Sequence, residues 1–162
     1  MQERLRAWGP TKIVRIASCV ILNENAEILL LKRHPDDLGG NKWGFPGGRV
    51  EPKEDPSETV IREVKEETGL ELDDVLPLGK HGVGMPHGAV QLSSFRTVVD
   101  SRSDIVLDPV EHVDYLWLPL GDVLTNRDLL WGIPSVLRDF DFIPDFTVDP
   151  TLSDGSSAVL LD

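Results

Sequence analysis

Apolar and polar positions in the first third of the chain alternate in short blocks that predict extended segments. Residues 12–22 form a β-branched, apolar run, and residues 26–33 form a second run after the polar turn 23–25. Two strand-like runs joined by a short turn predict a β-hairpin. Residues 43–50 are rich in glycine, and we expect this short stretch to be extended as well.

Between Asp55 and Gly69 the apolar spacing changes to that of a helix. One stripe recurs at 3.6-residue spacing, as expected for the buried face of a helix: Val60, Ile61, Val64 and Thr68. Asp55 is a favourable N-cap residue, Pro56 suits the first helical position, and Glu58 completes a capping box. Gly69 stands where a left-handed residue ends a helix. The sequence therefore predicts a capped, amphipathic helix.

The second half of the chain returns to strand-like patterns. We expect strands over residues 75–83, 89–99 and 113–118, a short helix over 119–124 and a further helical segment over 135–140. Strands that surround one long helix, with another helix late in the chain, predict an α/β domain with a mixed β-sheet. A length of 162 residues suits one domain with a real core, and no internal repeat or linker is visible.

Composition and charge argue against several classes of protein. The net charge is −12, whereas an extended nucleic-acid surface needs clustered Lys and Arg. We find no apolar run of membrane-spanning length and no signal-peptide core. Cys19 is the single cysteine and lies in an apolar run, so we expect a buried, structural thiol. Together these features suggest a cytoplasmic protein.

Three carboxylates on the predicted helix suggest a metal site. Glu63, Glu66 and Glu67 are spaced i, i+3 and i+4, so they share one face within one helical turn. Adjacent acids repel one another unless a cation neutralises them, and Mg²⁺ is commonly held by carboxylates together with substrate phosphates. The alternative is a solvated acidic face, because charge pattern alone is weak evidence. Arg62 is placed to hold one of these carboxylates through a charge-assisted hydrogen bond.

The register of these acids with their neighbours gives a stronger signal than the acids alone. Residues 48–70 read GRVEPKEDPSETVIREVKEETGL. They match the Nudix box at its defining positions: Gly48, Glu54, Arg62, Glu63, Glu66, Glu67 and Gly69, with aliphatic Val64 and Leu70. At average residue frequencies, a chance match at one start position has a probability on the order of 10⁻⁹. The chain thus resembles the MutT-like Nudix hydrolases.

The resemblance implies a Nudix-type α/β/α sandwich with a mixed β-sheet, with its core at about residues 14–140 of a single domain over residues 1–144. It implies hydrolysis of the pyrophosphate bond in a nucleoside diphosphate linked to another moiety. Candidate substrates are oxidised or normal (d)NTPs, ADP-ribose and nucleotide sugars. The implied cofactor is Mg²⁺, with Mn²⁺ as a substitute. The roles carried over are metal ligation by Gly47, Glu63, Glu66 and Glu67, and orientation of a ligand carboxylate by Arg62.

The Nudix box does not fix the general base. In some relatives the base is a box glutamate, which corresponds to Glu66 or Glu67, and in others it is an acid from a downstream loop. Glu111 is the best downstream candidate, because many relatives carry a glutamate a few residues before a comparable tryptophan, here Trp117. Asp108 and Asp114 are the alternatives, and a surface acid without a role is the simplest interpretation of each.

Candidate substrate-binding residues lie outside the box. Arg33 ends the second predicted strand and resembles a family position that meets phosphate, although a solvated strand end is the alternative. Phe45 is a candidate for stacking on a base, although core packing is the ordinary role of such a residue. Pro86 follows the box at a spacing that resembles the ADP-ribose hydrolases of the family.

Two further questions stay open at this point. Residues 145–162 form an acidic tail whose composition favours a loose segment, but the apolar stretch 158–161 offers docking on the body or on a partner subunit. A homodimer is therefore one alternative for the oligomeric state. The functional alternative is a non-catalytic, nucleotide-sensing module of Nudix fold. The intact box disfavours such a module, because these modules usually have a degraded box or a fused DNA-binding domain.

Overall fold

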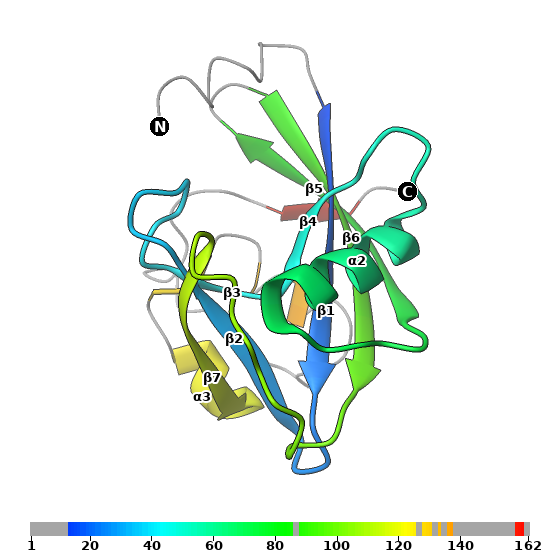
Figure 1. The fold of residues 1–162 in the computed structure, drawn as a ribbon. Helices are drawn as coiled ribbons and strands as arrows, with labels where there is room; N and C mark the ends of the chain where they lie inside the picture. The colour runs from blue at the N-terminus through cyan, green and yellow to red at the C-terminus, as the bar shows by residue number, and fades with distance from the viewer. Residues whose placement is uncertain are drawn as a thin grey trace.

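The computed structural model describes residues 13–85, 88–125, 128–130, 133, 136–137 and 158–160. Most of this part of the chain is a β-sheet with two helices (Figure 1). The elements are β1 (Ile13–Leu22), β2 (Glu27–Arg33), β3 (Trp43–Gly44), β4 (Gly47–Arg49), α2 (Pro56–Thr68), β5 (Leu76–Met85), β6 (Gly88–Val98), β7 (His112–Pro119), α3 (Leu120–Thr125) and β8 (Ala158–Leu160).

The sheet is mixed, as the sequence predicts. Its main path runs β3-β2-β1-β6-β5-β8, while β4 pairs with β1 and β7 pairs with β2. The pairing of β1 with β6 is parallel and runs without interruption from Ile13–Ala89 to Leu22–Val98, and the other strand pairs are antiparallel. The predicted hairpin of β1 and β2 is confirmed.

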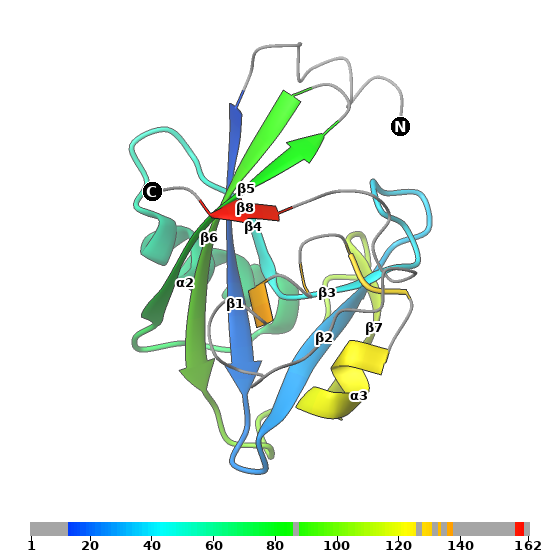
Figure 2. The same ribbon diagram turned by 180° about the vertical axis from the view of Figure 1, so that it is seen from behind.

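The two helices lie on opposite faces of the sheet. In Figure 1, α2 lies in front of β1 and β6, and in Figure 2, seen from behind, α3 lies in front. Successive residues of β2 supply two separate cores, because side chains alternate across a strand. Leu29 and Leu31 pack with Val60 and Val64 of α2, whereas the alternate residues of β2 pack on the α3 side, namely Ile28 and Leu30. This arrangement confirms the predicted α/β fold with layers on both faces.

Several further predictions meet the structure here. Cys19 is fully buried, and burial raises the pKa of its thiol to about 12, as expected for a structural cysteine. Of the helical segment predicted over 135–140, the structure describes Val136 and Leu137, which are helical and buried. Pro86 lies outside the described residues. In the described part of the chain, no helix is long and apolar enough to cross a membrane.

The apolar end of the acidic tail forms a strand. β8 pairs antiparallel with β5, with Leu160 opposite His81 and Ala158 opposite Val83. This strand extends the sheet beyond β5. For residues 158–160, docking on the body of the protein therefore describes the structure better than the loose segment that composition favours.

Candidate active site

Helix α2 begins and ends where the sequence predicts. The side chain of Asp55 accepts a hydrogen bond from the Ser57 backbone N–H, and Glu58 reaches back to the Asp55 backbone N–H to complete the capping box. Gly69 ends the helix with φ +74°, a left-handed conformation that glycine adopts without strain. The helix packs on β1, β4 and β6, so its carboxylates are held at a fixed height above the sheet.

Arg62 gathers the carboxylates at one end of the acidic face. Its guanidinium donates from Nε and Nη2 to the two oxygens of Glu54, a bidentate pair with distances of 3.1 and 3.0 Å. Nη1 donates to Glu63 at 2.8 Å and to Glu66 at 3.3 Å. These hydrogen bonds lower the pKa of Glu54 and raise that of Arg62, since each favours the charged form. The predicted contact between Arg62 and the box carboxylates is thus present, and Glu54 is its main partner.

Gly48 makes room for the Glu63 carboxylate. A Cβ atom at position 48 would collide with the carboxyl group of Glu63, so a glycine lets this side chain lie directly over β4. Glu63 is only 13% exposed there, and burial raises its pKa even though Arg62 opposes the shift. Gly48 and the Glu63 carboxyl group are therefore packed directly against each other.

Glu67 is the most buried of the three helix carboxylates. It is 2% exposed, whereas the Glu66 side chain is 55% exposed, so the acidic face is not a uniformly solvated surface. Glu67 Oε2 accepts a hydrogen bond from the Gly47 backbone N–H at 2.9 Å. Burial raises the pKa of Glu67 well above its usual value, and the nearby charges of Glu63 and Glu111 add to the shift. A buried carboxylate among other acids needs positive charge to stay ionised.

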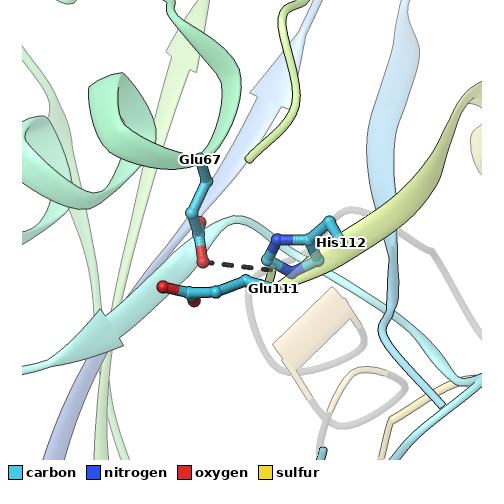
Figure 3. A group of neighbouring side chains, drawn as sticks. All are labelled: Glu67, Glu111 and His112. Atoms are coloured by element: carbon cyan, nitrogen blue, oxygen red, sulfur yellow. Dashed lines mark ion pairs between the residues drawn. The ribbon is translucent and has the colours of Figure 1, made fainter. Parts of the chain in front are cut away.

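A loop brings Glu111 to the same place. The backbone N–H groups of Val106 and Asp108 donate to the carbonyls of Thr68 and Glu67, at 2.9 and 3.2 Å, and so fix the loop against the end of α2. Glu111 follows on this loop just before β7, and one oxygen of its side chain lies near Glu67 (Figure 3). Burial raises the pKa of Glu111, and Asp108 contributes to the shift. The structure thus unites the downstream acid with the box.

His112 completes this group. One ligand atom each from Glu67, Glu111 and His112 lies within 4.8 Å of the others, as Figure 3 shows. The His112 ring is 4% exposed, and burial, together with the positive charge of Arg33, lowers its pKa to about 4. Its Nε2 is 3.9 Å from Glu67 Oε1, but a neutral imidazole at that distance makes neither an ion pair nor a hydrogen bond. The two side chains are therefore neighbours with neither a hydrogen bond nor an ion pair between them.

Arg33 supplies positive charge near this group. It ends β2 at an irregularity in the pairing with β7, and its guanidinium pairs with Asp37 at 2.7 Å. Its positive charge acts on Glu67 and Glu111, lowering the pKa of each against the larger effect of burial. Its Nε atom is buried without a hydrogen-bond partner. Arg33 therefore lies beside the carboxylates, with part of its donor capacity engaged by Asp37.

Comparison with known proteins decides the family. The model of the NUDIX domain matches residues 12–140, which is most of the chain. The chain belongs to the Nudix family. The solved structure of a MutT protein from Methanosarcina mazei Go1 superimposes with a TM-score of 0.73 at 30% identity and covers 80% of this chain and 94% of that one. The residues gathered at α2 are therefore the Nudix box in its family setting.

Two further relatives carry activities in their names. An 8-oxo-dGTP diphosphatase of Escherichia coli (strain K12) is 44% identical over 59 residues, which are 36% of this chain and 46% of that protein. The present Nudix chain thus spans less than half the length of that curated relative. The crystal structure of a Caenorhabditis elegans Ap4A hydrolase binary complex has a TM-score of 0.64 at 26% identity and covers 80% of this chain and 96% of that one.

The residues present fit a hard divalent cation, which Nudix proteins use. Glu63 is partly buried and Glu67 is fully buried, and Glu111 lies beside Glu67 from the loop. Oxygen-rich sites of this kind suit Mg²⁺ and Mn²⁺. A bound cation would also relieve the cost of three acids in a small volume. Glu66, at the exposed edge, remains a predicted ligand, as does the carbonyl of Gly47, whose N–H already holds Glu67.

Two residues show what sequence reasoning could and could not find in this Nudix site. Phe45 is half-buried and packs against the core on the α3 side of the sheet, so its stacking on a base stays a prediction without support from this packing. His112 was missed, because no second histidine or cysteine at metal-ligand spacing drew attention to it. The available signal was its place directly after Glu111, at the start of a strand.

Proposed function

We propose that this chain hydrolyses the pyrophosphate bond of a nucleoside diphosphate linked to another moiety. The observation that carries the proposal is the burial of Glu67 beside Glu63 and Glu111, in the register of the Nudix box. Burying an acid among acids costs free energy, and a site for a cation and a phosphate substrate gives that cost a function. Names of relatives that are diphosphatases and pyrophosphohydrolases support the same reaction class.

The side chains of the site have separate roles in the proposed reaction. Glu63, Glu66 and Glu67, with the Gly47 carbonyl, would hold Mg²⁺ or Mn²⁺, which neutralises phosphate oxygens and stabilises the leaving phosphate when bound. Arg62 keeps Glu63 and Glu66 oriented through its guanidinium fork. Arg33 offers positive charge to the substrate phosphates.

Glu111 is our candidate for the general base. It removes a proton from the attacking water as the water oxygen bonds to phosphorus and the P–O bond to the leaving phosphate breaks. A raised pKa suits a base that works near neutral pH. The position of Glu111 beside Glu67, on a loop tied to the end of α2, supports this role over that of a surface acid.

The substrate is a (d)NTP, oxidised or normal, in our first proposal, because an 8-oxo-dGTP diphosphatase is among the relatives. Dinucleoside polyphosphates, ADP-ribose and nucleotide sugars are the alternatives, and the Ap4A hydrolase neighbour supports the first of these. Formation of the nucleotide products should be measured by chromatography across this panel with Mg²⁺ and with Mn²⁺.

Two variants should accompany the panel. Glu67→Gln keeps the shape of the side chain but removes its charge, and we expect a loss of more than about 100-fold in kcat, since outer partners of metal ligands alone are worth 10–100-fold. Glu71→Gln is the control, because the Glu71 side chain is exposed and its carboxylate pairs with Lys65. Full activity of Glu67→Gln would overturn the metal assignment. Binding without turnover across the whole panel would favour the nucleotide-sensing module.

A further inference from the structure

His112 is a buried polar side chain to which the proposed reaction gives no role. It is the first residue of β7 and pairs with Arg33 of β2. Its ring points from the start of that strand toward Glu67 (Figure 3). Nε2 lies 3.9 Å from Glu67 Oε1, and Nδ1 is buried with no hydrogen-bond partner. These two nitrogens therefore have different surroundings, and the difference indicates which of them carries the proton.

The surroundings favour a proton on Nε2. A neutral imidazole has one N–H donor and one acceptor nitrogen, while an imidazolium has two donors. A proton on Nδ1 would bury an N–H group without an acceptor, and unpaired buried N–H groups are rare in native proteins. A proton on Nε2 instead faces a carboxylate oxygen. The lone pair left on Nδ1 is the smaller loss, since unsatisfied acceptors are better tolerated than unsatisfied donors.

We propose that His112 is a positioning residue whose Nε2–H group fixes the Glu67 carboxylate for cation binding. This inference rests on the proposed function of Glu67 as a metal ligand. The Gly47 N–H already holds Oε2 at 2.9 Å, and His112 stands on the side of Oε1. Two donors on the two oxygens would fix the plane of the carboxylate and leave its other lone pairs for the ion. This role requires the 3.9 Å gap to shorten to a hydrogen bond when the cation binds, as polar contacts in active sites often tighten on binding.

Direct ligation of the cation by His112 is the competing interpretation. Its Nε2 belongs to the same small group of atoms as the oxygens of Glu67 and Glu111. Ligation needs the lone pair of Nε2, which moves the proton to the partnerless Nδ1. Metal-bound histidines almost always donate that other N–H to an acceptor, and none is present here. The surroundings of Nδ1 therefore favour the donor role.

Nitrogen NMR on the metal-free protein tests the inference without any activity measurement. Long-range ¹H–¹⁵N spectra of ¹⁵N-labelled protein report which ring nitrogen of His112 is protonated, with the signals assigned by comparison with His112→Gln. We expect protonation at Nε2 in the metal-free protein and the same tautomer after addition of Mg²⁺. Protonation at Nδ1 in either state would overturn the inference.

A matched pair of variants tests the consequence for the cation. His112→Gln places an amide N–H near the position of Nε2, whereas His112→Asn reaches only as far as Nδ1. We expect His112→Asn to weaken Mn²⁺ binding, followed by electron paramagnetic resonance, by about 10–100-fold, and His112→Gln to stay within a few-fold of the wild type. Melting temperatures show whether both variants fold.

Equal Mn²⁺ affinity of both variants and the wild type would overturn the positioning role. The spectra of the wild type still decide the tautomer if His112→Asn fails to fold. Failure of the inference is separable from failure of the proposed function. If Glu67→Gln also binds Mn²⁺ as the wild type does, the assignment of Glu67 as a ligand is wrong, and not only the role of His112.

Discussion

The two ends of the acidic face of α2 solve the same electrostatic problem in opposite ways. At the Arg62 end, Glu54, Glu63 and Glu66 share one guanidinium, and Glu54 meets it with both oxygens. At the Glu67 end, the carboxylate is almost fully buried and accepts a hydrogen bond from the Gly47 backbone N–H. The first end has one guanidinium for three carboxylates, so the chain compensates part of its negative charge. The second end is incomplete, and in our proposal a cation completes it.

This difference distinguishes, within one sequence motif, the carboxylates that pair with Arg62 from the buried carboxylate of Glu67. An ion-pair network of partly exposed side chains contributes modestly to stability. A buried, poorly compensated carboxylate costs stability and persists where it has a function. Substitutions at the two ends should therefore have different signatures, which the following predictions use.

The largest effect should come from filling the space over Gly48. In Gly48→Ala the new Cβ atom collides with the Glu63 carboxyl group, which must leave its place between Arg62 and the Glu67 end. We expect a loss of turnover of about 100-fold, with little change in melting temperature, because the atoms in the way are the far end of a flexible side chain that can move aside. Gly121→Ala in α3 is the control, since a Cβ there meets nothing within 4 Å and alanine is the better helix former. Wild-type turnover in Gly48→Ala would show that the position of Glu63 does not matter.

A comparable loss of turnover should come from removing the charge of Glu111. Glu111→Gln keeps the length of the side chain, and we expect kcat to fall by about 100-fold, within the range of general-base catalysis. The melting temperature should change little, because Glu111 is an exposed residue in the loop before β7. Glu71→Gln, at an exposed position whose carboxylate pairs with Lys65, serves as the control. If kcat of Glu111→Gln is unchanged at saturating Mg²⁺, Glu111 is not the general base, and a box glutamate is the better candidate.

Arg62 should respond mainly in stability. In Arg62→Lys the positive charge remains, but the fork that reaches Glu54, Glu63 and Glu66 together is lost. We expect a loss of about 1 kcal/mol in the free energy of unfolding, because the side chain is partly exposed, together with weaker Mn²⁺ binding. Urea denaturation measures the first quantity. Arg102→Lys should leave stability unchanged, since its pair with Asp100 is on the surface.

The smallest effects should appear in the pH dependence of stability of the metal-free protein. Glu67 has a raised pKa, so the folded state keeps a proton that the unfolded chain releases, and this contribution to stability is lost as the pH rises above about 4.5. Glu54 has a lowered pKa, so its contribution is lost as the pH falls below about 4.5. Glu67→Gln should therefore gain stability over the wild type toward neutral pH, and Glu54→Gln should lose it there. If stability changes with pH in the same way in both variants, the proposed difference between the two ends of the acidic face is wrong.

Much of this contrast between the two ends of the acidic face could not be predicted from the sequence, because it depends on tertiary packing. Periodicity and caps predict α2 to within a residue at each end, because both are local. The register of the box predicts that Arg62 meets its carboxylates. The burial of Glu67 was not predictable, because it depends on the loop before β7 lying across the end of the helix. For the same reason, nothing in the local pattern marked His112.

The long parallel pairing of β1 with β6 bears on how quickly this protein folds. Ile13 lies opposite Ala89, so the whole segment with β4 and α2 is enclosed between two strands that pair along their full length. Such non-local, parallel contacts raise the contact order and slow folding, since loop closure precedes the gain from pairing. Helix α2 rests on both of these strands. The box therefore reaches its final geometry only after this long-range closure, and newly made protein should acquire cation affinity late in refolding.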